Sequence, residues 1–243
     1  MIVVAGFSPI ARRSDPPHTA YPIVSAPRQL TLDLVKPPQP SLDNFVVGRN
    51  AEAVAAVRST MTGAGERFIY LWGETGAGRS HLLQALGLEV RSGRVPAFDA
   101  HQHLYAVDDV DTLNESRQQR LFVLLNEIRA DPTARFVGTG NAAPMHLALR
   151  DDVRTRLAWG LVYQIHALSD DEKAHALTAH AASRGLALSG EVVDYLLTHM
   201  PRDMRALVAV VDALDTYALS AKKLLTVPLV RHWAEDGANR SAP

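Results

Sequence analysis

A glycine-rich stretch in the first half of the chain has the composition of a phosphate-binding loop. Residues 73–80 read Gly-Glu-Thr-Gly-Ala-Gly-Arg-Ser, which fits the spacing G-x-x-x-x-G-K-[ST] with Arg79 in place of the lysine. Glycines let backbone N–H groups turn inward around a phosphate, and a following helix would present its positive N-terminus. The loop therefore predicts a nucleotide-phosphate site in which Ser80 holds Mg²⁺. A glycine-rich turn without a ligand is the alternative interpretation.

Arg79 is the one departure from that spacing. Lysine is a compact point charge that reaches the terminal phosphates, whereas the guanidinium is bulkier and planar. Phosphoryl transfer depends mostly on positioning, so we expect binding to survive this change and fast intrinsic hydrolysis to be disfavoured.

Two acids follow a later apolar segment. Asp108 and Asp109 come directly after Leu104–Val107, which reads LYAV. After a phosphate loop, this pattern predicts that Asp108 faces Mg²⁺ and that Asp109 polarises water. Without such a loop, two acids at a strand end are commonly a solvated turn.

The elements that must position these residues predict an α/β fold with a parallel sheet, because strands and helices alternate along the chain. Apolar, β-branched runs indicate strands, and helical periodicity with Asn50 as an N-cap indicates helices. We expect strands at residues 67–72, 103–110 and 135–139, and helices at 50–61, 79–91 and 115–130.

The second half of the chain has only helix signals after His166. Ser169 to Glu172 forms a capping box, Gly185 ends that helix, and Ser189 begins the next. A third helix is expected from Pro201 to about Ala221, and Thr226 and Pro228 are expected to open a fourth.

Three regions follow from these patterns. Prolines crowd the first forty residues and disfavour regular structure there. We expect a disordered tail at 1–40, an α/β domain at 41–165 and a small all-α domain at 166–243.

Composition limits the classes of function. The formal net charge of −1 gives no global field for DNA, and we expect no direct sequence-specific DNA binding. The chain has no cysteine, and no apolar run approaches the ~20 residues that span a bilayer. We therefore expect a cytoplasmic protein without membrane contact. The ten histidines form no pattern that predicts a metal site.

Four short segments together carry a family resemblance. They are Leu42–Arg49 (LDNFVVGR), Gly76–His81 (GAGRSH), Arg156–Gly160 (RLAWG) and Arg202–Arg205 (RDMR). In this order and spacing they resemble the DnaA lineage of AAA+ proteins, and most closely its DnaA-homologous regulators, the Hda family. That resemblance covers the chain from about Gln29 to the C-terminus. It implies an AAA+ P-loop sheet followed by a small helical lid.

The resemblance implies a site for ADP or ATP with Mg²⁺. Asn141 would be the polar sensor after the third strand, with Thr139 as second choice. Arg205 would reach the nucleotide from the lid, with Arg202 as its alternative. The Mg²⁺ would lie at Ser80 and Asp108. The remaining nucleotide-binding residues would be Val46, Val47, Gly73, Gly76, Ala77, Gly78, Arg79 and His81.

The resemblance also makes Arg156 an arginine finger, a residue that acts on the nucleotide of a neighbouring molecule. Arginine supplied in trans stabilises charge on a transferring phosphoryl group. Arg150 and Arg154 compete for this assignment, and a surface ion pair is the structural alternative.

The tail contains one segment with a clear pattern, Gln29-Leu-Thr-Leu-Asp-Leu34. In an extended chain Leu30, Leu32 and Leu34 share one face, beside the glutamine. The segment resembles the peptide with which partners bind the sliding clamp, the β subunit of DNA polymerase III. A chance alternation of polar and apolar residues is the other interpretation.

These features favour a negative regulator of replication initiation that binds adenine nucleotide and the clamp and stimulates hydrolysis of DnaA-bound ATP. DnaA is then a partner, and a homo-oligomer is a further possibility. An initiator-like ATPase or a helicase-loader-like adaptor acting on DNA is the alternative. Arg79 and the lack of room for a DNA-binding domain before Pro243 disfavour the initiator-like ATPase. The clamp peptide disfavours the helicase-loader-like adaptor.

One stretch does not fit the family pattern. Val95 to Asp99 has strand character, yet the next strand begins near His103. A parallel crossover needs a dozen or more residues, so the family's intervening helix is missing. The stretch either turns back as a hairpin or lies outside the sheet.

Overall fold

A computed structural model describes residues 38–240, and the peptide at 29–34 lies outside this part. Its centre is a four-stranded parallel sheet in the order β2-β3-β1-β4. The expected parallel α/β sheet is thus confirmed. The strands are β1 (Phe68–Trp72), β2 (Leu104–Val107), β3 (Arg135–Gly140) and β4 (Leu161–Gln164).

The central position of β1 accounts for its apolar sequence. β1 reads FIYLW and pairs with β3 on one side and β4 on the other, so its residues are covered on both faces. Alternate side chains of β1 enter two separate cores: Phe68 and Tyr70 in one, Ile69 and Leu71 in the other. A strand buried on both faces reads as a continuous apolar run.

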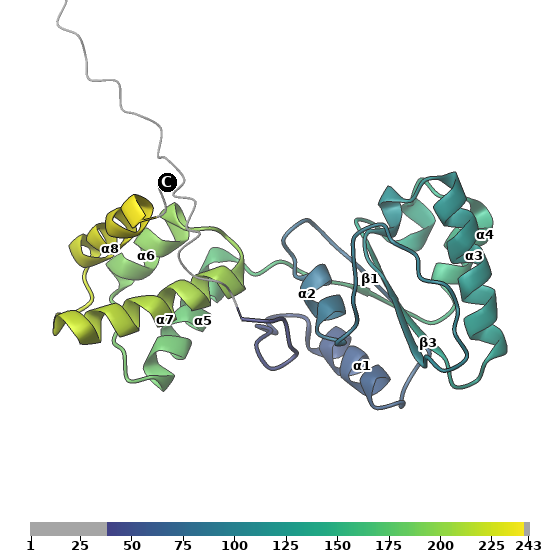
Figure 1. Ribbon diagram of the computed structural model, residues 1–243, viewed down its shortest axis with the longest axis horizontal. Helices are drawn as coiled ribbons and strands as arrows, with labels where there is room; N and C mark the ends of the chain where they lie inside the picture. Colours follow the sequence, from purple (N-terminus) through teal and green to yellow (C-terminus); the bar gives the residue numbers. More distant parts are fainter. Residues whose placement is uncertain (1–37, 241–243) are drawn as a thin grey trace, which may run out of the picture.

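Helices cover both faces of the sheet (Figure 1). The core that contains Ile69 is closed by α1 (Ala51–Met61) and α2 (Arg79–Gln84). On the opposite face lie α3 (Glu115–Ala130) and α4 (Asp151–Leu157). Two short 3-10 helices, Val110–Thr112 and Pro144–His146, follow β2 and β3.

The last part of the described chain is entirely helical and has a core of its own. Figure 1 shows it beside α1 and α2, away from α3 and α4. Its helices are α5 (Asp170–Ser183), α6 (Gly190–His199), α7 (Met204–Ala221) and α8 (Val227–Arg240).

The expected helix signals in this part are confirmed. Ser169 and Glu172 make both hydrogen bonds of a capping box. Ser189 accepts from the backbone of Val192 at the start of α6, and Gly185 has a φ of 77° after α5. The third helix begins later than expected, because the side chain of Asp203, rather than Pro201, caps it.

In the sheet region one expectation is wrong and one strand was not expected. The helix expected at residues 79–91 ends at Gln84, because the chain turns through Gly87 at a φ of 75°. The strand at Leu161–Gln164 was missed altogether.

Residues 95–99 form no strand, so the second of the two expected alternatives holds. Phe98 stacks on Tyr105 with ring centroids 5.5 Å apart, and the backbone N–H of Asp99 donates to the Tyr105 hydroxyl at 2.9 Å. Contacts with the Tyr105 side chain therefore hold this segment against β2.

Within residues 38–240, no helix combines the length and the apolar character needed to cross a membrane.

Candidate functional site

The glycine-rich loop between β1 and α2 borders a cavity of about 300 Å³. Loop residues form one wall, and side chains from the end of β2 and the start of α7 form the other. The residues that line the cavity are Thr75, Gly76, Gly78, Arg79, Ser80, His81, Asp109, Asp203 and Arg205.

Close packing around this loop requires glycine at two positions. A Cβ on Gly73 would lie 2.2 Å from the backbone oxygen of Ile165. Gly78 has a φ of 98°, and a Cβ there would lie 2.7 Å from the Phe45 ring. Side chains at these positions would push the loop away from β4 and from the segment before α1.

Arg79 projects into the cavity with an incompletely satisfied guanidinium. Its side chain is only 10% exposed, and its Nη2 lies 3.7 Å from Oδ1 of Asp109. Within the described part of the chain, its buried Nη1 has no hydrogen-bond partner. A buried charged donor without an acceptor is costly, so an anionic ligand would relieve this arrangement.

The two acids after β2 have different surroundings. Asp108 is 5% exposed, and its carboxylate accepts a hydrogen bond from the hydroxyl of Thr139. Asp109 lines the cavity, has a φ of 49°, and donates its backbone N–H to the same hydroxyl at 3.0 Å. Of the two sensor candidates, Thr139 contacts the acids. Asn141 is exposed, and its backbone N–H donates to Asp111 at 3.0 Å.

The segment before α1 meets the loop from the other side. Val46 lines a second, smaller cavity of about 50 Å³ between the loop and the helical part. Ala77 lines it too, whereas the side chain of Val47 packs into the core beneath α1. The two valines, both predicted to bind the nucleotide, therefore face different surroundings.

Asn50 ties this segment to the chain that leads into α5. Its side-chain amide donates to the backbone oxygen of His166 at 3.0 Å and accepts from the backbone N–H of His166 at 2.8 Å. Asn50 occupies the predicted N-cap position of α1, but its side chain makes no capping hydrogen bond to that helix. Its amide is already engaged across the molecule.

The surroundings of His81 favour the neutral form of its imidazole. Burial lowers its pKa below the usual value, against the opposing effect of the Ser41 backbone oxygen, which lies 2.9 Å from Nε2. Its ring also meets Phe45 edge-on at 5.2 Å. The positive charge facing the cavity therefore comes from the arginines.

Arg205 is the arginine of the helical part that reaches the loop. It borders both cavities and is 26% exposed, and its Nε lies 3.8 Å from Oδ1 of Asp203. That distance is too long for a hydrogen bond, and the buried Nε has no other partner within residues 38–240. Arg202 borders only the smaller cavity, is 72% exposed and lies 3.4 Å from Asp170.

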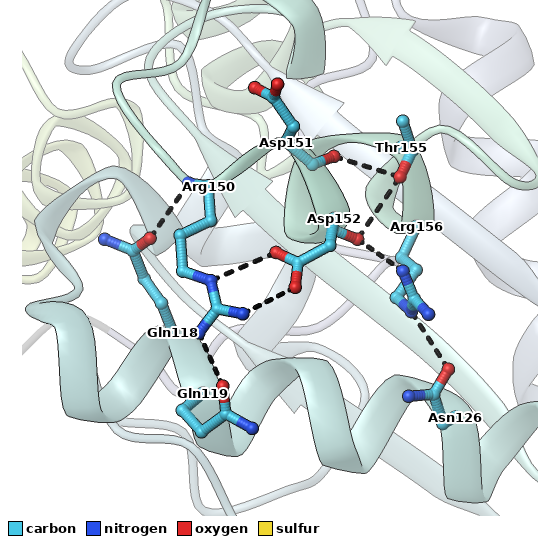
Figure 2. Close-up of polar contacts among 8 residues, drawn as sticks. All are labelled: Gln118, Gln119, Asn126, Arg150, Asp151, Asp152, Thr155 and Arg156. Atoms are coloured by element: carbon cyan, nitrogen blue, oxygen red, sulfur yellow. Dashed lines mark hydrogen bonds and ion pairs between the residues drawn. The ribbon is translucent and has the colours of Figure 1, made fainter.

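Three arginines on and before α4, Arg150, Arg154 and Arg156, form a separate group on the face of the sheet covered by α3. Figure 2 shows Arg150 and Arg156 with their polar contacts. Arg150 binds Asp152 through two nitrogens, at 3.2 and 2.6 Å, and also contacts Gln119. Arg154 pairs with Asp151. Both are therefore engaged in local ion pairs.

Arg156 is held differently from its two neighbours. Its Nε donates to Asn126 on α3 at 2.9 Å, and its Nη1 donates to the backbone oxygen of Asp152 at 2.8 Å (Figure 2). The guanidinium carbon lies 4.0 Å from the ring centre of Phe122 and 5.2 Å from that of Trp159. These contacts fix the orientation of the Arg156 guanidinium against α3.

Two family descriptions match parts of the chain. Residues 38–97 match the bacterial DnaA ATPase domain, and residues 170–233 match the Hda lid domain. The first match includes the phosphate loop, and the second covers α5, α6, α7 and the start of α8.

Solved structures with the same fold include initiators and a DNA motor. Domain III of DnaA from Thermotoga maritima has a TM-score of 0.60 and 20% identity, covering 83% of this chain and 99% of that one. AMPPCP-bound DnaA from Aquifex aeolicus has a TM-score of 0.58 and 22% identity, covering 77% and 68%. The RuvB Holliday junction branch migration motor of T. maritima has a TM-score of 0.55 and 15% identity, covering 81% and 71%. These likenesses confirm the expected AAA+ fold.

Proposed function

We propose that this DnaA-lineage AAA+ protein, which joins a DnaA-type ATPase region to an Hda-type lid, is a negative regulator of replication initiation. It binds ADP or ATP between the loop and the lid, and it docks on the sliding clamp through its tail. It then stimulates hydrolysis of DnaA-bound ATP with an arginine of α4. We further propose a tail at 1–40, an ATPase domain at 41–165 and a lid at 166–243.

One observation carries the nucleotide site: the buried, incompletely paired guanidinium of Arg79 in a cavity walled by loop glycines. Arg205 on the opposite wall has the same property. Guanidinium groups bind phosphates through several parallel hydrogen bonds, so a diphosphate or triphosphate between them would satisfy both. Val46 and Ala77 in the adjoining cavity would contact the base.

Ser80 and Asp108 would hold Mg²⁺ beside this cavity. Ser80 lines the cavity, whereas Asp108, directly after β2, is buried behind the lining residue Asp109 and has one carboxylate oxygen bound to Thr139. Hydroxyl and carboxylate oxygens are suitable ligands for Mg²⁺. When bound, the ion would supply positive charge to the phosphate oxygens. Arg79, in place of the usual lysine, supports slow turnover by the protein itself.

The location of Arg156 supports action on another molecule. Arg156 packs against α3, on the face of the sheet opposite α2 and the loop. An arginine there is directed away from its own phosphate site. A fixed guanidinium is also suited to catalysis, because its orientation is set before the neighbour's phosphate arrives.

The experiment compares three alanine variants in an assay of DnaA-bound ATP hydrolysis with clamp-loaded DNA. Arg156→Ala should abolish stimulation, because an arginine finger contributes about 10³- to 10⁵-fold in rate. Arg150→Ala and Arg154→Ala should retain most of it. Loss with Arg150→Ala or Arg154→Ala, but not with Arg156→Ala, would assign the finger to another residue. Full stimulation by all three would favour an adaptor function.

A further inference from the structure

The segment after α2 contacts the acids of the proposed nucleotide site at two points. The hydroxyl of Ser92 donates to Oδ2 of Asp109 at 2.7 Å, and the backbone N–H of Gly93 donates to the backbone oxygen of Asp108 at 2.9 Å. Gly93 has a φ of 65°, and a Cβ there would lie 2.9 Å from the hydroxyl of Thr112. The tight approach of this segment to β2 therefore depends on a glycine beside Ser92.

Asp109 also faces the arginine of the loop. Its other carboxylate oxygen, Oδ1, lies 3.7 Å from Nη2 of Arg79. At that distance the two charges attract each other, but no hydrogen bond forms between them. A carboxylate in direct contact with a guanidinium frequently forms two parallel hydrogen bonds, at about 2.7–2.9 Å. The observed separation therefore leaves the hydrogen-bonding capacity of Arg79 unused.

We propose that Ser92 is a positioning residue that restrains the Asp109 carboxylate and so reserves Arg79 for the phosphates of the nucleotide. This inference rests on the proposed nucleotide site. The backbone of Asp109 is itself held by Thr139 and, through its carbonyl oxygen, by the backbone N–H of Thr112 at 2.9 Å. Side-chain rotation is therefore the freedom that remains, and the hydrogen bond from Ser92 limits it.

Without the hydroxyl of Ser92, the carboxylate can rotate toward Arg79 and form the close pair. Asp109 would then compete with phosphate for the same guanidinium. Ser92→Ala should therefore weaken the binding of ADP and ATP, although Ser92 itself is exposed on the segment and does not line the cavity.

The test is a double-mutant cycle measured by isothermal titration with ADP. Ser92→Ala should raise the Kd about tenfold, the effect of one charge-assisted hydrogen bond. Ser92→Thr should restore the affinity because it keeps the hydroxyl. In an Asp109→Asn background, Ser92→Ala should have little further effect, because a neutral amide competes poorly for Arg79. Asparagine is chosen because it tolerates the positive φ at this position.

Adenosine is the ligand control, since it lacks phosphate. Adenosine should bind the wild type and Ser92→Ala with the same affinity, or should bind neither of them. A wild type that binds no ADP would overturn the nucleotide site itself. If Ser92→Ala binds ADP as tightly as the wild type does, the inference fails. It also fails if Ser92→Ala weakens ADP binding by the same factor in the Asp109→Asn background, or weakens adenosine binding equally, because Ser92 then does not act through Asp109.

Discussion

Arginine side chains in this protein differ mainly in how far their hydrogen-bonding capacity is used. Arg79 and Arg205 border the loop cavity, and each has a buried nitrogen without a partner in the part of the chain that the structure describes. Arg156 donates through two nitrogens and stacks on Phe122. Arg154 also has a buried nitrogen without a partner among the described residues, but it pairs with Asp151 and does not line the cavity. Arg79 and Arg205 therefore resemble ligand-binding groups because they also border the cavity, whereas replacing Arg156 has a structural consequence as well.

Replacing the lid arginine should weaken nucleotide binding. Arg205→Ala removes a charge-assisted hydrogen bond to phosphate, and the Kd for ADP should rise about tenfold. Isothermal titration measures this, with Arg202→Ala as the control, because Arg202 is exposed and borders only the smaller cavity. Loss of affinity in Arg202→Ala alone would transfer the sensor assignment to that residue.

Replacing Arg156 should also lower stability. Arg156→Ala loses the stacking on Phe122 and the hydrogen bond to Asn126, and the free energy of unfolding should fall by about 1–2 kcal/mol. Arg154→Ala should cost less, because its partner Asp151 is largely exposed. Urea denaturation followed by circular dichroism measures both. An equal loss in the two variants would contradict this account of Arg156, and the ATPase assays must be run where both variants are folded.

Local patterns predict elements well where one interaction decides the outcome. The capping box at Ser169 needs only two side chains and their own backbone, and it forms as expected. β4 was missed because it has four residues and lies at an edge, where its exposed side chains give little burial pattern. The length of α2 depends on Gly87, a single glycine that ends the helix early.

The parts of the site that are local in sequence were predictable, and the parts that depend on contacts between distant segments were not. Spacing identified the loop and the acids, because both are contiguous in sequence. It could not show that Thr139 rather than Asn141 contacts Asp108, since that depends on the register of β2 against β3. The contact between Ser92 and Asp109 was missed, because it joins residues 17 positions apart with no motif between them.

The junction between the segment before α1 and the chain entering α5 should depend on one amide. Asn50 is 4% exposed and makes two hydrogen bonds with the backbone of His166. Asn50→Ala leaves two buried backbone groups without partners, and we expect a loss of about 2–4 kcal/mol in unfolding free energy. Asn141→Ala, at an exposed position, is the control. A thermal midpoint for Asn50→Ala equal to that of the control would show that these bonds contribute little.

At the scale of the whole molecule, the two proposed activities lie on opposite faces of the sheet. The loop cavity is lined by the phosphate loop, the start of α2 and the start of α7, whereas Arg156 donates a hydrogen bond to Asn126 on α3. Figure 1 shows α2 and α3 on opposite sides of the sheet. This separation allows the protein to bind its own nucleotide while α4 contacts another molecule. The tail before residue 38 would add a third contact, with the clamp.

Clamp binding should be separable from folding. Gln29→Ala, or Leu32→Ala combined with Leu34→Ala, should abolish capture by the sliding clamp in surface plasmon resonance. The melting temperature should not change, because these residues precede the cores that the structure describes. Thr31→Ala is a matched control, because in a peptide bound in extended form Thr31 would face away from the leucines. Undiminished binding by the leucine double variant would reject the peptide assignment.

The proposed function requires that the protein provoke hydrolysis of ATP bound to DnaA. The most direct measurement is the half-life of radiolabelled ATP on DnaA in four mixtures: alone, with clamp-loaded DNA, with this protein, and with both. The account predicts a half-life shortened by at least tenfold only when both are present, and no shortening when Arg156→Ala replaces the wild type. An unchanged half-life with folded, nucleotide-bound and clamp-bound protein would contradict it.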